Sequence, residues 1–394
     1  MTEVTKAPKG GSGFAKRILR ETFVQFGARL GLYWILLLVI VAVFAPFLAS
    51  SQPLLLSEQG SVQSPVFEYL TPLDTTLLAV FIAVVVLVFI KPRLLTTVGV
   101  LLLVLGIAGG LSAWLVKPPQ LITYEQYRDN AAQGAYDWVV WAPVPFSPKD
   151  YLRDRGDTGL EAPLEADDRR HFFGTDENGA DVLSRMIHAS RIALGIGFVA
   201  TGIAMFLGVI IGGLMGYFSG VVDMIGMRVV EIFEAIPTLF LLLTFVAFFG
   251  RSLYIMMVII GITSWSGYAR YIRAEFLKLR QQDFVQAAIA CGTPLPSILF
   301  RHMLPNGIAP VLVGASFGVA SAILAEATLS FLGLGLVDDP SWGQMLNQAV
   351  RAATFNWWMA AFPGGAIFLT VFAYNLMGES MRDAIDPYLK KSAS

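Results

Sequence analysis

The sequence is poor in the residues on which disulfide-rich proteins, metal enzymes and soluble domains depend. Its 394 residues include one cysteine, Cys291, and three histidines. One cysteine excludes an intrachain disulfide bond, and the scattered histidines lack the spacing of metal ligands. Only 14% of the residues are charged, whereas about 25% is usual in soluble domains. The chain is therefore not expected to be a soluble globular protein.

Several catalytic and binding signatures are missing as well. No glycine is followed directly by lysine, so the sequence contains no phosphate-binding P-loop. It also lacks the combination of nucleophile, base and metal ligands that a membrane enzyme would need. The net charge of −1 gives no support for a nucleic-acid partner. We therefore expect no enzyme activity, no cofactor on this chain and no nucleic-acid binding.

Long apolar runs, by contrast, are abundant. Hydrophobic residues make up 55% of the chain, and the mean hydropathy is +0.63. The runs are continuous, whereas a membrane β-barrel would show alternating segments of about ten residues. The sequence predicts an all-α, polytopic membrane protein, a helical bundle of about eight transmembrane helices. The predicted spans are Leu30–Ala49, Leu73–Ile90, Leu94–Val116, Ile192–Phe218, Val229–Phe249, Leu253–Tyr268, Ile308–Leu336 and Trp357–Met377.

Basic residues in the short loops predict the orientation. With eight spans, every strong cluster of lysine and arginine in a short loop falls on one side, which is the cytoplasmic side by the positive-inside rule. Both termini are then cytoplasmic, and the long segment 117–190 is extracytoplasmic. Within that segment Thr175 or Asp176 is expected to cap an interfacial helix through 181–185. The clusters are Lys16 to Arg29, Lys91 with Arg93, Arg270 to Arg301, and Lys390 with Lys391.

A polar island at 283–305 interrupts the apolar pattern. A helical run is predicted to end at Gly292, and Pro294 and Pro296 suit the first turn of a second short helix. That helix is expected to end near Leu304-Pro305-Asn306. Small Ala287 and Ala288 would offer a face that a partner could approach closely. Such a helix–turn–helix on the membrane surface suits a subunit that receives force from a soluble partner.

This island resembles the EAA loop of ABC-importer permeases, which docks into a cleft of a cytoplasmic ATPase. Where the family usually has glutamate this chain has Gln286, so a contact that depends on that carboxylate would be weaker. The resemblance implies that this loop couples ATP hydrolysis to transport. The implied coupling residues are Asp283, Gln286, Ala287, Ala288, Gly292, Arg301, Leu304 and Pro305.

The resemblance extends over roughly 171–388. Gly174-Thr-Asp, Pro340-Ser-Trp-Gly and the Asp386-Pro387 pair resemble the C-type permeases of the Opp/Dpp peptide and nickel family. Within that family, Trp138-Val-Val-Trp141-Ala-Pro143 and Gly174-Thr-Asp-Glu-Asn-Gly179 look most like the Yej-type peptide permeases. The pair of spans 73–116 is an apparent insertion into the usual six-helix form, expected to face lipid. The implied divisions are a cytoplasmic segment 1–28, a first transmembrane helix 29–50, an inserted hairpin 73–116, an extracytoplasmic loop 117–190 with an interfacial helix, and a permease core 191–388 with the coupling loop 269–306.

The resemblance implies a permease subunit that moves peptides across the bacterial inner membrane by alternating access. ATP and Mg²⁺ would bind a separate ATPase, present in one or two copies, and a second permease and an extracytoplasmic substrate-binding protein would complete the assembly. A nickel or metal-chelate importer stays open as an alternative. An ATP-independent secondary transporter is a further alternative, although the spans contain few of the paired ionisable residues it would need.

Some residues inside the predicted spans suggest close packing or a path for substrate. Gly208, Gly212 and Gly216 repeat at every fourth position, which favours close helix contact within one permease or between two. Arg228 is the expected ion-pair partner of Glu231. Glu326 and Ser330 are candidates for the translocation path, because acids inside a membrane are often functional. A hydrogen bond that packs helices together is the equal alternative for Glu326.

Overall fold

The computed structural model describes residues 20–92, 94–119, 122–152, 160–165, 171–336 and 339–385. The residues before Arg20, Arg93, Asp386-Pro387, Lys390 and Lys391 lie outside the described residues, and with them several of the predicted basic positions. The chain forms two compact units. Unit 1 consists of Met1–Leu36, Ile192–Asp338 and Gly365–Ser394, and unit 2 of Leu37–Arg191 and Asp339–Gly364.

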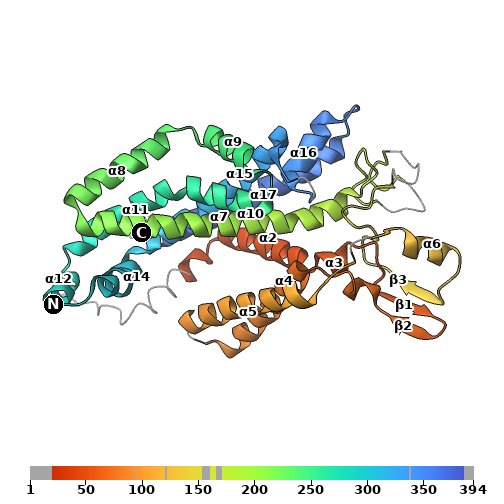
Figure 1. Ribbon diagram of the computed structural model, residues 1–394, viewed down its shortest axis with the longest axis horizontal. Coiled ribbons are helices and arrows are strands. Elements are labelled where there is room, and N and C mark those ends of the chain that lie inside the picture. Colours follow the sequence, from red (N-terminus) through yellow and green to blue (C-terminus); the bar gives the residue numbers. More distant parts are fainter. Residues whose placement is uncertain are drawn as a thin grey trace. The chain divides into compact units, whose positions relative to one another are not determined.

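Unit 1 is helical (Figure 1). Three long helices, α2 (Phe26–Val43), α7 (Val182–Phe218) and α17 (Trp357–Ile385), each belong in part to unit 1 and in part to unit 2. The other elements of unit 1 are α8 (Gly220–Ala235), α9 (Thr238–Phe249), α10 (Leu253–Thr263), α11 (Trp265–Arg280), α12 (Asp283–Ala290), α13 (Leu295–Ser297), η3 (Ile298–Met303), α14 (Leu304–Gly307), α15 (Ala309–Leu329) and η4 (Ser330–Leu334).

Unit 2 adds a small antiparallel sheet to its helices, with strand order β2-β1-β3. Leu56 of β1 pairs with Gln63 of β2 and with Val139 of β3. The sequence analysis did not predict this sheet, although the fold is predominantly helical as expected. The elements are α3 (Ala45–Leu48), β1 (Leu55–Glu58), β2 (Ser61–Gln63), η1 (Pro65–Phe67), α4 (Pro72–Ile90), α5 (Leu94–Leu115), α6 (Gln126–Ala132), β3 (Trp138–Val140) and α16 (Trp342–Arg351).

Six described helices are long and apolar enough to cross a membrane, or seven if the bent pair α8–α9 counts as one span. The predicted number of eight is therefore not confirmed. The predicted span Val229–Phe249 is broken between α8 and α9, which meet at 83°, because Pro237 lacks the N–H that would continue the helix. The predicted span Leu253–Tyr268 is likewise divided at Ser264, and α10 alone has 11 residues.

The inserted hairpin is formed by α4 and α5, which pack against each other. Thr71 and Asp74 form a reciprocal capping box at the start of α4, and Pro72 occupies its first turn. The hairpin turns at Lys91, which adopts a left-handed conformation with φ of 51°. Both helices are apolar, and only 11% and 6% of their spanning windows are buried. A hairpin that faces lipid stays a prediction.

Arg191 links the start of α4, at the base of this hairpin, to the end of α2. The guanidinium of Arg191 contacts Asp74 Oδ1 at 2.5 Å and donates to the carbonyl oxygen of Ala42 at 2.5 Å. The side chains of Arg191 and Asp74 are 11% and 5% exposed. Arg191 therefore satisfies an orphan carbonyl near the end of α2 and the cap of α4 at the same time.

We expect Arg191→Met to destabilise the protein by about 3 kcal/mol, because it leaves Asp74 buried without its cation. The matched control is Arg228→Met. The side chains of the Arg228–Glu231 pair are 73% and 42% exposed, so this loss should cost less than about 1 kcal/mol. Thermal unfolding of the detergent-solubilised complexes measures both variants. Equal shifts would show that Arg191 does not anchor the hairpin.

The start of α7 corrects the predicted interfacial helix. Asp181 caps the helix by accepting from the Ser184 N–H at 2.6 Å, so neither Thr175 nor Asp176 is the cap. From Val182 the helix continues unbroken to Phe218. No proline or glycine interrupts residues 182–194, so nothing separates an interfacial helix from the span. Leu183 packs on a small core of unit 2.

Candidate functional site

The turn at Gly292 is built as the sequence predicted. Helix α12 ends at Ala290, and Gly292 follows in a left-handed conformation with φ of 71°. The Gly292 N–H donates to the Ile289 carbonyl oxygen at 3.0 Å, and the Thr293 N–H donates to the Ala288 carbonyl oxygen at 3.1 Å. This pair of hydrogen bonds is the Schellman motif, which requires a positive φ at the glycine position.

The two faces of α12 have different roles. Val285 and Ala288 are buried and pack on a core that includes Phe276 of α11. Ala287 is exposed on the other face, together with Phe284, whose exposed fraction is 42%. Ala287 and Ala288 were predicted to share one face that a partner could approach. Only Ala287 lies on that face, because Ala288 follows Val285 by three residues and shares its inward direction.

The segment after Gly292 forms the predicted second helix. Pro296 lies in its first turn as expected, whereas Pro294 lies one position earlier, at the N-cap of α13. The helix runs through α13, η3 and α14 to Gly307, in agreement with the predicted end near Leu304-Pro305-Asn306. Pro305 lies in the first turn of α14, directly after the π-helical turn η3. Arg301 and Pro305 are exposed, and Leu304 is half-buried.

Gln286 has a structural role that a carboxylate could not fill. Its Nε2 donates to the carbonyl oxygen of Arg280 at 2.8 Å, at the C-terminal end of α11. An ionised glutamate has acceptors only and would leave this carbonyl without the bond. The Gln286 amide therefore links α12 to α11. Asp283 lies in the first turn of α12, where a negative charge interacts favourably with the helix dipole.

Helix α11 packs closely against α7. The stripe of Gly208, Gly212 and Gly216 lies directly against the α11 backbone. A Cβ on Gly216 would lie 2.6 Å from Phe276 Cβ, and a Cβ on Gly212 would overlap the Ala269 carbonyl oxygen. The close helix contact predicted from the glycine spacing is thus present, and it lies within one chain.

Three arginines of α11 form ion pairs or hydrogen bonds with residues that precede α11 in the chain. Arg270 contacts Glu234 at 2.5 Å, and Arg273 makes two bonds to the Asp223 carboxylate. The hydrogen bond to Asp223 raises the pKa of Arg273. Arg280 donates to Ser219 Oγ at 2.6 Å. Arg270, Arg273 and Arg280 were predicted only as basic residues of a cytoplasmic loop, and these acidic and hydroxyl partners were not predicted.

The two candidates for a translocation path lie inside the helix packing. Glu326 and Ser330 are 2% and 1% exposed. Ser330 Oγ donates to Glu326 Oε1 at 2.6 Å, between positions four residues apart. This bond joins neighbouring turns of one helical run rather than two helices, so it does not test the alternative of a hydrogen bond that packs helices together. Their place on a path stays a prediction.

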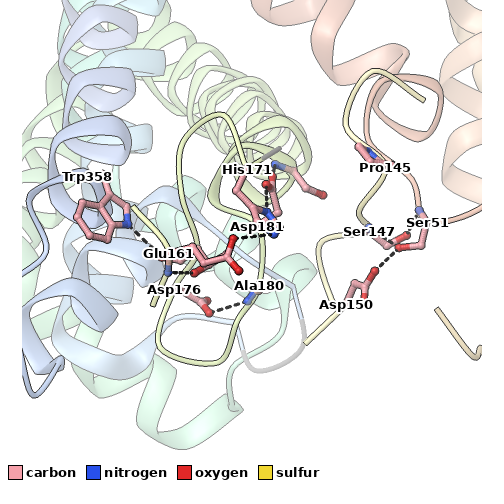
Figure 2. A network of polar contacts seen from close by, with 12 residues as sticks. Ser51, Pro145, Ser147, Asp150, Glu161, His171, Asp176, Ala180, Asp181 and Trp358 are labelled. Atoms are coloured by element: carbon pink, nitrogen blue, oxygen red, sulfur yellow. Dashed lines mark hydrogen bonds and ion pairs between the residues drawn. The ribbon is translucent and has the colours of Figure 1, made fainter. Parts of the chain in front are cut away.

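A cluster of polar contacts in unit 2 surrounds the Gly174-Thr-Asp motif (Figure 2). The Trp358 indole N–H and the Thr175 carbonyl oxygen are 3.0 Å apart. His171 Nδ1 lies 2.8 Å from Asp181 Oδ2, and Asp176 accepts from the Ala180 N–H. In the same view Ser51 Oγ donates to Asp150 at 2.5 Å. These buried contacts hold the loop in place.

Comparisons with known proteins identify the family to which this chain belongs. Residues 208–391 match the family described as "Binding-protein-dependent transport system inner membrane component". The oligopeptide transport system permease protein OppC of Haemophilus influenzae is 39% identical over 218 residues, which are 55% of this chain and 70% of that protein. The chain belongs to this family. It is a permease subunit of an ABC importer, which explains why a P-loop is missing.

Other relatives match a similar share of the permease. The di/tripeptide permease protein DppC of Pseudomonas aeruginosa is 38% identical over 65% of this chain and 85% of its own. The glutathione permease protein GsiD of Pectobacterium atrosepticum is 37% identical over 64% and 83%. A chain of the inward-facing MetNI methionine ABC transporter covers 51% of this chain and 96% of its own, at 18% identity and a TM-score of 0.43.

Proposed function

We propose that this permease imports peptides across the bacterial inner membrane and that residues 283–305 receive the movement of a partner ATPase. One observation carries the coupling role. The outer face of α12 is exposed while its inner face, through Val285 and Ala288, is packed on α11. Movement of α12 would therefore move α11, which the glycine stripe and the Arg273–Asp223 pair hold against α7 and α8.

The proposed assembly contains a second permease, one or two cytoplasmic ATPases that bind ATP and Mg²⁺, and an extracytoplasmic substrate-binding protein. Alternating access would follow from closure of the ATPases. Both termini and the coupling loop would lie in the cytoplasm, as the basic loop residues predict. The peptide substrate is supported by relatives named for oligopeptides, di/tripeptides and glutathione.

The coupling role is tested by Ala287→Trp. We expect this bulky side chain on the exposed face of α12 to abolish co-purification of a P-loop ATPase and to reduce ATP-driven uptake of trialanine by at least about tenfold, which corresponds to about 1.4 kcal/mol of lost contact. The measurement is a mild-detergent pull-down with mass spectrometry, followed by uptake in proteoliposomes.

The matched control is Ala132→Trp, at an exposed alanine in α6 of unit 2. It should retain both the ATPase and uptake, which separates loss of coupling from poor membrane insertion. Full uptake by Ala287→Trp would remove the coupling role from this loop. Uptake of Ni²⁺ chelates without uptake of trialanine would favour the nickel importer, and transport that survives ATP depletion would favour a secondary transporter.

A further inference from the structure

The side chain of His171 lies between two carboxylates beside the start of α7, within unit 2 (Figure 2). Its ring is buried and stacks on Phe146, with the two ring centroids 4.3 Å apart. His171 Nδ1 lies 2.8 Å from Asp181 Oδ2, and Nε2 lies 3.7 Å from Glu161 Oε2. The two nitrogens of one imidazole therefore face two different acids.

The contact between His171 and Glu161 depends on the protonation of the ring. A neutral imidazole has one N–H, so it can donate to only one of the two acids. The distance to Asp181 is that of a hydrogen bond, whereas His171 Nε2 and Glu161 Oε2 are both buried and have no hydrogen-bond partner among the described residues. A proton on Nε2 would turn this unfavourable contact into a charge-assisted hydrogen bond.

The other charged groups of this region already have partners. Arg185 of α7 pairs with Asp176, and Arg128 of α6 pairs with Asp150 at 2.6 Å. Glu165, the second acid of the segment that carries Glu161, accepts a backbone N–H at 2.7 Å. Within the described part of the chain, the ring of His171 is thus the group placed to supply a positive charge between its two acids.

Glu161 belongs to a strap, residues 160–165, that lies against the Gly174-Thr-Asp motif. The Glu161 N–H donates to Thr175 Oγ1 at 2.9 Å, and the Thr175 N–H donates to the Glu161 carbonyl oxygen at 3.0 Å. A Cβ on Gly174 would lie 2.6 Å from that carbonyl oxygen and 2.9 Å from Trp358 Nε1 of α17. The strap is therefore packed where α7 and α17 begin.

We propose that His171 is a proton-operated clasp for this strap. The protonated ring binds Glu161 and Asp181 at once and closes the strap, and loss of the proton releases Glu161. Because the closed strap binds the proton more tightly than the open one, acid favours the closed state, and this stabilisation is lost as the pH rises. Histidine suits the role because its charge changes within about pH 5–8. The clasp does not depend on which substrate is transported.

Hydrogen–deuterium exchange of the full chain, purified with its partner chains and placed in lipid nanodiscs, tests the clasp. The rates are corrected for the intrinsic pH dependence of amide exchange. We expect the amides of residues 160–165 to exchange about tenfold more slowly at about pH 5.5 than at about pH 8, the order expected for one hydrogen bond between charged groups. Equal corrected rates at the two pH values would overturn the inference.

Glu161→Gln distinguishes a proton switch from a contact that only supports the fold. The new amide can donate to the neutral Nε2 or accept from the protonated ring, so the strap should stay protected at both pH values. His188→Gln is the matched control, because it removes the other histidine of unit 2 and should keep the tenfold difference. A pH dependence that persists in Glu161→Gln, or one that disappears in His188→Gln, would contradict the clasp.

Discussion

Gly292→Val is expected to reduce ATP-driven trialanine uptake to below about a tenth of wild type. Gly292 has a φ of 71°, where a β-branched side chain is strained, and the cost of about 1–2 kcal/mol falls on the Schellman turn that ends α12. A Cβ at this position would meet no atom within 4 Å, so the effect comes from the backbone and spares the core. Uptake in proteoliposomes, with co-purification of the ATPase, measures it.

The matched variant is Gly292→Asn, because asparagine tolerates the left-handed conformation better than valine. It should retain most of the uptake, and both variants should insert into the membrane in equal amounts. If Gly292→Asn failed as completely as Gly292→Val, side-chain bulk at the docking face, and not the positive φ, would explain the loss. Wild-type uptake by Gly292→Val would show that the turn is not needed for coupling.

The second large effect is expected at Gly212. Gly212→Val would place a branched side chain where even a Cβ overlaps the Ala269 carbonyl oxygen of α11. Backbone cannot yield as a flexible side chain does, so α7 and α11 must separate. We expect a loss of about 3 kcal/mol or more in stability, the upper range for overpacking. Thermal unfolding and the yield of assembled complex measure this loss.

Gly202 provides the control on the same helix. A Cβ there meets no atom within 4 Å, so Gly202→Ala should leave stability within about 0.5 kcal/mol of wild type, as for substitutions away from packed positions. Gly212→Ala should already be destabilising, since its added atom is the one that overlaps Ala269. Similar unfolding temperatures for the two alanine variants would contradict the α7–α11 contact.

Much of the candidate site could be predicted because its signals are local. The positive φ at Gly292 follows from a helical run that must turn sharply, and Pro294 fits the start of the next helix. The predicted pair of Arg228 and Glu231 is also confirmed, at 2.5 Å. Each of these features depends on residues within a few positions of one another.

Two predictions were wrong because more than one local rule applied to the same residues. Helix α7 begins at Val182 because the Asp181 side chain accepts the Ser184 N–H, while Asp176, an equally good cap by type, binds the turn before it. The predicted span Val229–Phe249 treated Pro237 as part of one straight helix, because hydropathy alone does not show that proline lacks the N–H needed to continue a helix. Apolar length therefore overestimated the number of straight spans.

The sequence by itself determined that this protein is a helical membrane permease without its own P-loop, with a helix pair hinged at Gly292. These properties follow from hydropathy, glycine geometry and motif spacing, all of which are local. Only the tertiary structure decided that the Gly212 stripe packs on α11 and that Ala288 faces inward. Those outcomes depend on which distant helices meet, because burial and hydrogen bonding are fixed by neighbours in space rather than along the chain.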